Sequence, residues 1–171
     1  MKTILIFLTM ALKMTVQAQT PEDNLLKQGI TLPELSKSLG NYVSLVRSGN
    51  LIFLAGRGPL KEDGSFVNGK LGKELNVRDG YAAARLCTIA QIAVLKAELG
   101  DLSKIRHIVK VTGFVSCVDT FTDHPKVVNG CSDLLVKVFG AKGIHSRSAV
   151  GVTSLPSGWP VEVEMIVEVM P

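Results

Sequence analysis

The sequence has few of the residues that build metal sites or disulfide frameworks. It contains three cysteines and three histidines, and no Cys-x-x-Cys or Cys/His spacing typical of zinc sites occurs. Cys87, Cys117 and Cys131 are odd in number, and each lies inside an apolar stretch. We therefore interpret them as small core residues and expect no metal site.

The sequence also lacks nucleotide-binding glycine motifs and a strong net charge. Gly56 and Gly58 form an isolated Gly-x-Gly, and neither GxGxxG nor a P-loop is present. The formal net charge is +4, and loss of residues 1–18 with Lys2 and Lys13 lowers it to +2. This balance does not favour nucleic-acid binding. The lack of a histidine pair or an aromatic and basic stripe argues against a ribonuclease.

The apolar run near the N-terminus is far shorter than the ~20 residues that cross a bilayer. Lys2 precedes the run Ile4–Leu12, and Val16-Gln17-Ala18 follows it. This order is typical of a secretory signal peptide. We expect residues 1–18 to be removed and the protein to be exported, to a periplasm or outside the cell, with no membrane association after cleavage. Because Lys13 interrupts the pattern, the alternative is an amphipathic helix retained in a cytoplasmic protein.

The remaining chain has the length and the 46% hydrophobic content of one domain with a real core. Residues 19–38 read as a helical arm, with a second helical turn led by Thr31-Leu32-Pro33-Glu34, and residues 39–171 as a single domain. The expected strands are Tyr42–Arg47, Leu51–Ala55, a short edge strand around Phe66, and Ile105–Val118; the expected helices are Asn76–Leu99 and Asp123–Phe139.

The stretch from Arg147 to Glu168 is the most informative part of the chain. Arg147–Val152 and Val161–Val169 are rich in β-branched residues, and the segment between them holds prolines and a glycine, which predicts a β-hairpin. In the second arm, valines and a methionine alternate with glutamates. In such a hairpin, Arg147 lies at about the same level along the paired strands as Glu164. The pair is read either as a site for an anionic substrate or as a cross-strand ion pair.

The expected element order is β-β-α-β-α-β-β. Helices that alternate with strands between terminal hairpins predict an α+β plait, a mixed sheet with both helices on one face. Two helices cannot cover the second face, which is half apolar. We therefore expect a homo-oligomer.

Several of these residues resemble the Rid (YjgF-type) family of reactive-intermediate deaminases over about Leu39–Val169. The resemblance rests on Arg147-Ser148 with Val150, Leu155-Pro156 and Val161-Glu162-Val163-Glu164, and on Tyr42, Gly49-Asn50, Gly56, Pro59 and Gly100-Asp101-Leu102 upstream. It implies a chorismate-mutase-like fold and a homotrimer with pockets between subunits. The chain is most similar to a divergent branch with an extended N-terminal arm and the stretch Val128–Leu134.

The resemblance also implies an activity and a site. Members hydrolyse enamines and imines to a ketoacid and ammonia, for which orientation, a positioned water and a proton carrier suffice without a metal or organic cofactor. By this similarity Arg147 binds the substrate carboxylate, and Glu164 holds or protonates through the attacking water. Tyr42 lines the pocket, and backbone groups near Gly56 and Ala149 contact the substrate.

Four positions depart from the family pattern. Ala149 replaces a cysteine, Ala55-Gly56-Arg57 replaces Ser-Gly-Gln, and Asp119 replaces an asparagine. Arg57 and Asp119 could each change the charge of the pocket. The alternative function is therefore a trimer that binds small carboxylates without turnover.

Some residues near the motif keep two interpretations. Tyr42 either lines the pocket or covers the first hairpin, and Trp159 either rims the pocket or pins the turn. Glu162 and Glu168 are interpreted as solvated or subunit-interface charges.

Overall fold

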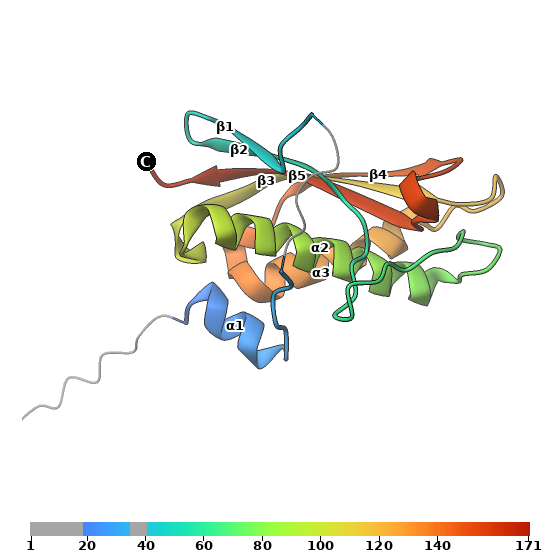
Figure 1. Cartoon of the computed structure of the whole chain (residues 1–171), viewed down its shortest axis with the longest axis horizontal. Coiled ribbons are helices and arrows are strands. Elements are labelled where there is room, and N and C mark those ends of the chain that lie inside the picture. Colours follow the sequence, from blue (N-terminus) through green and yellow to red (C-terminus); the bar gives the residue numbers. More distant parts are fainter. Residues whose placement is uncertain (1–18, 35–40) are drawn as a thin grey trace, which may run out of the picture.

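The computed structural model describes residues 19–34 and 41–171. A five-stranded sheet forms one layer, α2 and α3 form a second, and α1 lies outside them (Figure 1). The elements are α1 (Pro21–Lys27), β1 (Leu45–Ser48), β2 (Leu51–Arg57), α2 (Val77–Leu99), η1 (Leu102–Lys104), β3 (Ile105–Ser116), α3 (His124–Phe139), η2 (Gly140–Gly143), β4 (Ser146–Val152), η3 (Pro156–Gly158) and β5 (Val161–Val169). The predicted signal peptide lies outside the described residues, in which no helix has the length and apolar character of a membrane span.

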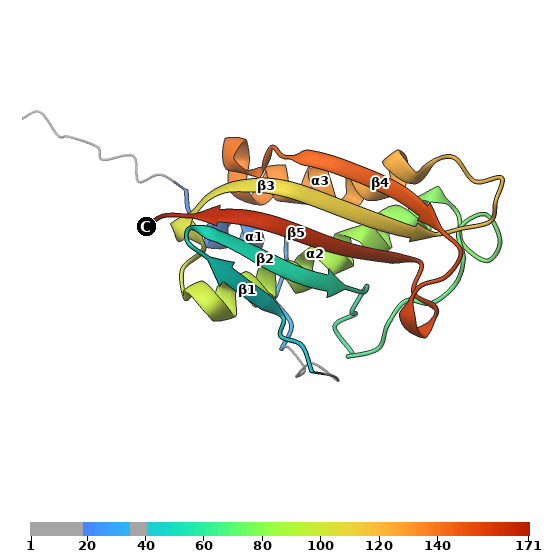
Figure 2. The ribbon, with the colours of Figure 1, turned by 90° about the horizontal axis from the view of Figure 1, so that it is seen from above.

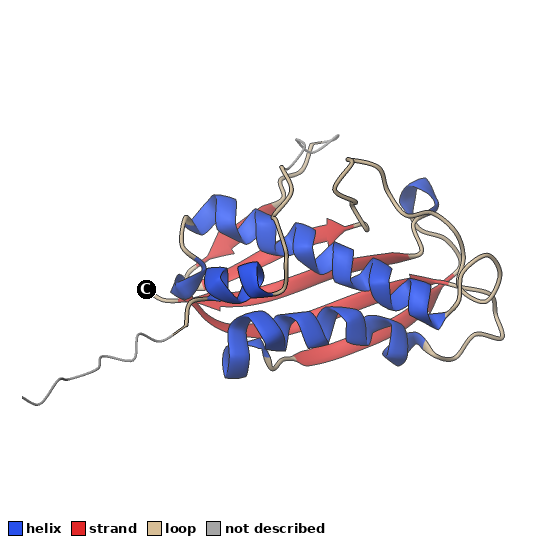
Figure 3. Cartoon of the chain, turned by 90° about the horizontal axis from the view of Figure 1, so that it is seen from below, coloured by secondary structure: helices blue, strands red, loops and turns tan. Residues whose placement is uncertain are grey.

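The strands follow the order β1-β2-β5-β3-β4 (Figure 2). β5 is antiparallel to β2 and to β3, whereas β4 is parallel to β3. Both long helices lie under the same face (Figure 3). The expected α+β plait with a mixed sheet and helices on one face is therefore confirmed.

The predicted hairpin of Arg147–Val152 with Val161–Val169 is wrong. β5 is inserted between β2 and β3, so β3 separates it from β4. The alternating residues of β5 are fully buried from Val161 to Val169, and such a row needs strand neighbours on both sides and helices beneath it. β4 has only half-buried and exposed residues, as an edge strand does.

The first hairpin is confirmed. Ser48 pairs with Leu51, and Gly49 adopts the left-handed conformation that the tight turn requires (φ 59°). β1 starts at Leu45, later than expected, and β2 continues to Arg57. Around Phe66 there is an isolated bridge to Leu60 instead of a strand.

A buried glutamine of α2 anchors the end of β2. The pairing of β2 with β5 shifts register between Leu54 and Arg57, which takes Ala55 out of the regular ladder. Gln91 is fully buried and its Nε2 donates to the carbonyl oxygens of Ala55 (2.9 Å) and Val163 (2.5 Å). These bonds satisfy the freed carbonyl and fix the backbone beside Gly56.

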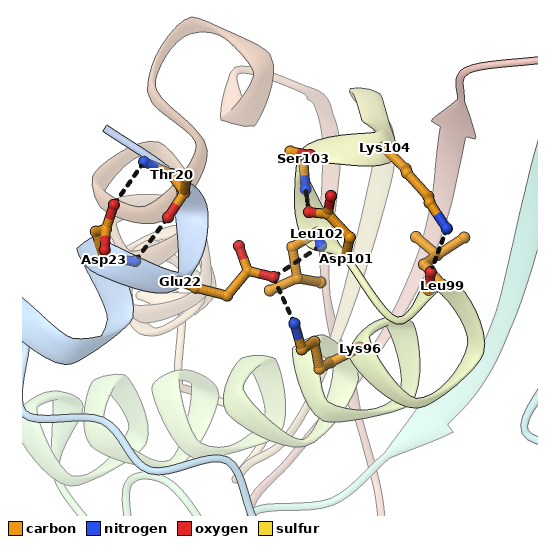
Figure 4. A network of polar contacts seen from close by, with 9 residues as sticks. All are labelled: Thr20, Glu22, Asp23, Lys96, Leu99, Asp101, Leu102, Ser103 and Lys104. Carbon is orange, nitrogen blue, oxygen red and sulfur yellow. Dashed lines mark hydrogen bonds and ion pairs between the residues drawn. The ribbon is translucent and has the colours of Figure 1, made fainter. Parts of the chain in front are cut away.

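The N-terminal arm is attached through Glu22 (Figure 4). Its Oε1 accepts from Lys96 Nζ (2.7 Å) and from the amide of Leu102 (2.9 Å). Thr20 caps α1 by accepting from the amide of Asp23. The second helical turn is not found in the described part of the arm, since residues 31–34 carry no helix; the rest of that prediction lies outside the described residues.

Candidate functional site

Arg147 lies on the edge strand β4, with its side chain on the helix face. It pairs with Val111 of β3, which is buried under the helices. Its Nη1 donates to Asn129 Oδ1 (2.8 Å) and Ser132 Oγ (2.9 Å), and its Nη2 donates to the carbonyl of Pro125 (3.4 Å). Three groups of α3 thus hold the guanidinium at the edge of the sheet, where it can receive an anion.

A glycine of β3 allows α3 to approach Arg147. Gly113 pairs with Ala149, and a Cβ at Gly113 would lie 2.6 Å from Val128 Cγ2. Because Asn129 follows Val128 on α3, this close packing brings its amide to the guanidinium. Ala149 is half-buried two residues beyond Arg147, on the same face of the strand.

Glu164 lies on the other face of the sheet. It pairs with Thr112, is exposed, and lines a shallow hollow of about 340 Å³ with Phe53, Lys110 and other residues of the open face. Arg147 and Glu164 therefore point to opposite faces within one chain. Their predicted convergence does not occur in the single subunit, because it depended on the hairpin.

Glu162 is a carboxylate in a more enclosed place. It is half-buried, and its carboxylate lies so close to Gly56 that a Cβ there would overlap Oε1. Burial raises the pKa of Glu162, and the charge of Glu164 raises it further. Glu162 was interpreted as a solvated or subunit-interface charge; its half-burial disagrees with full solvation, and the interface interpretation stays a prediction. The available signal was the period of two, which places both glutamates on one face of the strand.

The site residues fall into two groups that are far apart in one chain. We call the group of Arg147, Ala149, Asn129 and Ser132 the Arg147 half-site. We call the group of Gly56 and Glu162, with Tyr42 nearby in the chain before β1, the Glu162 half-site. β5 and β3 separate Gly56 of β2 from β4, which places these two strands about 14 Å apart. Glu162 of β5 is separated from β4 by β3 alone and lies on the sheet face opposite to Arg147. Tyr42 is 60% exposed, so its ring is available to a neighbouring molecule.

The charged departures from the family pattern lie outside the Arg147 half-site. Arg57 Nη2 donates to Ser44 Oγ. Asp119 is exposed and lines a separate cavity of about 300 Å³ with Cys117 and His124, whose Sγ and Nε2 are 3.3 Å apart. Neither charge is directed at Arg147.

Trp159 packs on the loop that follows β2. Its ring lies 5.1 Å from that of Phe66, centre to centre, and directly over Gly58. The Trp159 side chain therefore joins this loop to the segment before β5; the hairpin whose turn it was predicted to pin does not form.

In the part of the chain that the structure describes, no three His, Cys, Asp or Glu side chains gather at one place. A larger cavity of about 800 Å³ lies between the arm, the loop of residues 60–64 and α2, and none of the predicted site residues lines it. The predictions also missed Asn129 and Ser132. Their i, i+3 spacing on α3 places them on one helix face, but the sequence does not show that this face meets Arg147.

Comparison with known proteins agrees with this architecture. Residues 22–166 match the family described as "YjgF/chorismate mutase-like, putative endoribonuclease". The chain is 42% identical to protein TCP17 of Trypanosoma cruzi over 146 residues, which covers 85% of this chain and 91% of the relative.

Two solved structures share the fold closely. Atu1372 of Agrobacterium tumefaciens, a protein of unknown function, is 40% identical with a TM-score of 0.82 over 88% of this chain and 94% of that one. A Shewanella oneidensis protein described as a "putative endoribonuclease" is 36% identical with a TM-score of 0.85 over 88% and 99%. With its motifs, its sheet order and these matches, the chain belongs to the YjgF/chorismate mutase-like (Rid) family.

Proposed function

We propose that the protein hydrolyses small 2-iminoacids to 2-ketoacids and ammonia, at sites formed between the subunits of a homotrimer. The observation that carries the proposal is Arg147, a guanidinium held by α3 at an edge that no strand covers in the described chain. A planar, permanently charged group in this position suits a bidentate carboxylate. The substrate class follows from that clamp and from the family resemblance.

The subunit arrangement is part of the proposal. A neighbouring copy that brings its Gly56 end to the free edge of β4 would join the Glu162 half-site to the Arg147 half-site. The open sheet face supports association, because it carries exposed Phe53, Val46 and Val150. No metal or organic cofactor enters the scheme.

In the joined site each group has one task. Arg147 binds the carboxylate and so orients the iminium carbon, which is already electrophilic. A carboxylate of β5 takes a proton from the attacking water and returns it to the departing ammonia. Glu164 was predicted for this role. We assign it to Glu162, because Glu162 is half-buried beside Gly56 and burial raises its pKa, as is common for carboxyl groups that carry protons in catalysis.

The test is to generate 2-iminopropanoate in situ and follow the loss of its absorbance. We expect turnover by the wild type, and loss of turnover in Arg147→Ala. Pyruvate binding should weaken ~10- to 150-fold in this variant, which corresponds to ~1.5–3 kcal/mol. Arg78→Ala, at an exposed arginine of α2, is the control and should match the wild type.

The same assay separates the alternatives. Pyruvate binding that needs Arg147, without turnover, would support the trimer that only binds small carboxylates. Unchanged pyruvate affinity in Arg147→Ala would contradict both. The word endoribonuclease, used for the family and a relative, suggests RNA as a second substrate; the net charge of +4 gives that little support.

A further inference from the structure

A chain of hydrogen bonds continues behind Arg147 into the loop that precedes β4. Arg147 Nη1 lies 2.9 Å from Ser132 Oγ. Ser132 Oγ lies 3.0 Å from His145 Nε2, and His145 Nδ1 lies 2.7 Å from the carbonyl oxygen of Gly143. The chain therefore links the guanidinium to an imidazole through one hydroxyl group.

The donor and acceptor roles along this chain have one consistent solution. A carbonyl oxygen accepts only, so Nδ1 of His145 carries the hydrogen. In the neutral ring Nε2 is then an acceptor, and the Ser132 hydroxyl must donate to it. An arginine has no acceptor, so a lone pair of Ser132 Oγ accepts from Arg147. The Ser132 hydroxyl thus donates its hydrogen to His145 and accepts from Arg147.

The surroundings favour the neutral imidazole. Burial lowers the pKa of His145; the bond to the Gly143 carbonyl raises it, and the charges of Arg147 and His107 lower it again. α3 presents the uncharged Ser132 to it, while Asp133 accepts from Tyr81 on α2 (2.8 Å). The ammonium of Lys142 is held by backbone oxygens of Ser103 and Ile105.

We propose that His145, acting through Ser132, is a positioning residue for Arg147 that takes up a proton when a carboxylate binds there. This deepens the proposed function, since it rests on Arg147 as the carboxylate clamp. A bound carboxylate cancels the field of the guanidinium at His145, and the ring then gains a proton from solvent at Nε2. Nε2–H donates to Ser132 Oγ, and the Ser132 hydroxyl hydrogen is released to donate to the ligand.

The first test needs no ligand. Nitrogen NMR of the imidazoles should find the Nδ1–H tautomer of His145, with a pKa below the ordinary range. Arg147→Met removes the positive charge and should raise this pKa by ~0.5 or more. His124, which contacts Cys117 and Phe121, is the internal control and should not follow. The proposal is overturned if His145 is the Nε2–H tautomer, or if the pKa of His145 is the same in Arg147→Met as in the wild type.

The second test measures proton uptake. Pyruvate is titrated into the protein by calorimetry near pH 7, in two buffers with different ionisation enthalpies. The wild type should take up protons on binding; His145→Gln should take up none and bind ~3- to 10-fold more weakly, because the Ser132 hydroxyl is no longer held. Uptake that persists in His145→Gln contradicts the proposal. If the wild type does not bind pyruvate, the proposed function fails, while the NMR test still decides the role of His145.

Discussion

Glu162 and Glu164 lie two residues apart on one face of β5, but in different surroundings. Glu162 is half-buried against Gly56, whereas Glu164 is exposed over the open face. The charge of Glu164 contributes to the raised pKa of Glu162. Two neighbouring carboxylates with unequal burial are suited to unequal tasks, in which one carries the proton and the other adjusts its pKa.

This difference in burial predicts different effects for two variants, Glu162→Gln and Glu164→Gln. Glu162→Gln keeps shape but cannot carry a proton, so turnover should fall ~10²-fold or more, with pyruvate binding retained. Glu164→Gln removes a repelling charge, so the Glu162 pKa should fall and the acid limb of the kcat/KM profile should move to lower pH. Steady-state kinetics from pH 4 to 9 measure both effects. Loss of turnover in Glu164→Gln alone would return the role to Glu164, the residue that the sequence predicted.

At this scale the sequence predicts the chemical type of a residue better than its surroundings. Arg147 could be chosen because a permanent cation in an apolar strand is unusual and its motif resembles the family's. The burial of Glu162 could not be predicted from the sequence, since it depends on Gly56 of another strand. Ser132 and His145 gain their connection only where α3 meets the start of β4.

Among the elements, the N-terminal arm is held by the buried side chain of Leu25, by a hydrogen bond from Asn24 to the Val138 carbonyl, and by the carboxylate of Glu22. Glu22 accepts from Lys96 and from the Leu102 amide. Its partial burial acts to raise its pKa, but these bonds prevail and lower it. A lowered folded-state pKa means that ionised Glu22 stabilises the attached arm above its unfolded pKa of about 4.3, and that this contribution disappears as pH falls through the folded-state value.

We therefore expect Glu22→Gln to lower the free energy of unfolding by about 0.5–1 kcal/mol at pH 7, since water partly screens the pair. The difference from wild type should become smaller at pH 3, which is below the ordinary range of a glutamate pKa. Urea unfolding at the two pH values measures it, with Glu98→Gln, an exposed glutamate of α2, as the control. A deficit of equal size at both pH values would show that charge is not what attaches the arm.

Local signals predicted the elements well, and pairing was predicted poorly. Asn76 and Gly100 mark the ends of α2 as expected, because a cap acts within a few residues. The turn at Gly49 likewise fixed the first hairpin. The alternation in β5 identifies a buried face but does not name the neighbouring strand, so the insertion of β5 between β2 and β3 was missed.

At the scale of the whole molecule, the sheet order keeps the two half-sites apart. β2 and β4 are separated by two strands, so neither Tyr42 nor Gly56 of a subunit can complete the site at its own Arg147. We propose that another copy does so. Oligomerisation is then a requirement of the proposed activity and not only a source of stability.

The central claim is that each site combines Arg147 of one subunit with Glu162 of another. Arg147→Ala and Glu162→Gln subunits can be co-expressed with different tags, and trimers that contain both can be purified through both tags; sedimentation should first give three times the subunit mass. Each variant alone should be nearly inactive. In every mixed trimer one of the three interfaces joins an intact Arg147 to an intact Glu162, so we predict about one third of wild-type turnover of 2-iminopropanoate. Mixed trimers as inactive as the two parents, or a monomer in sedimentation, would contradict the account.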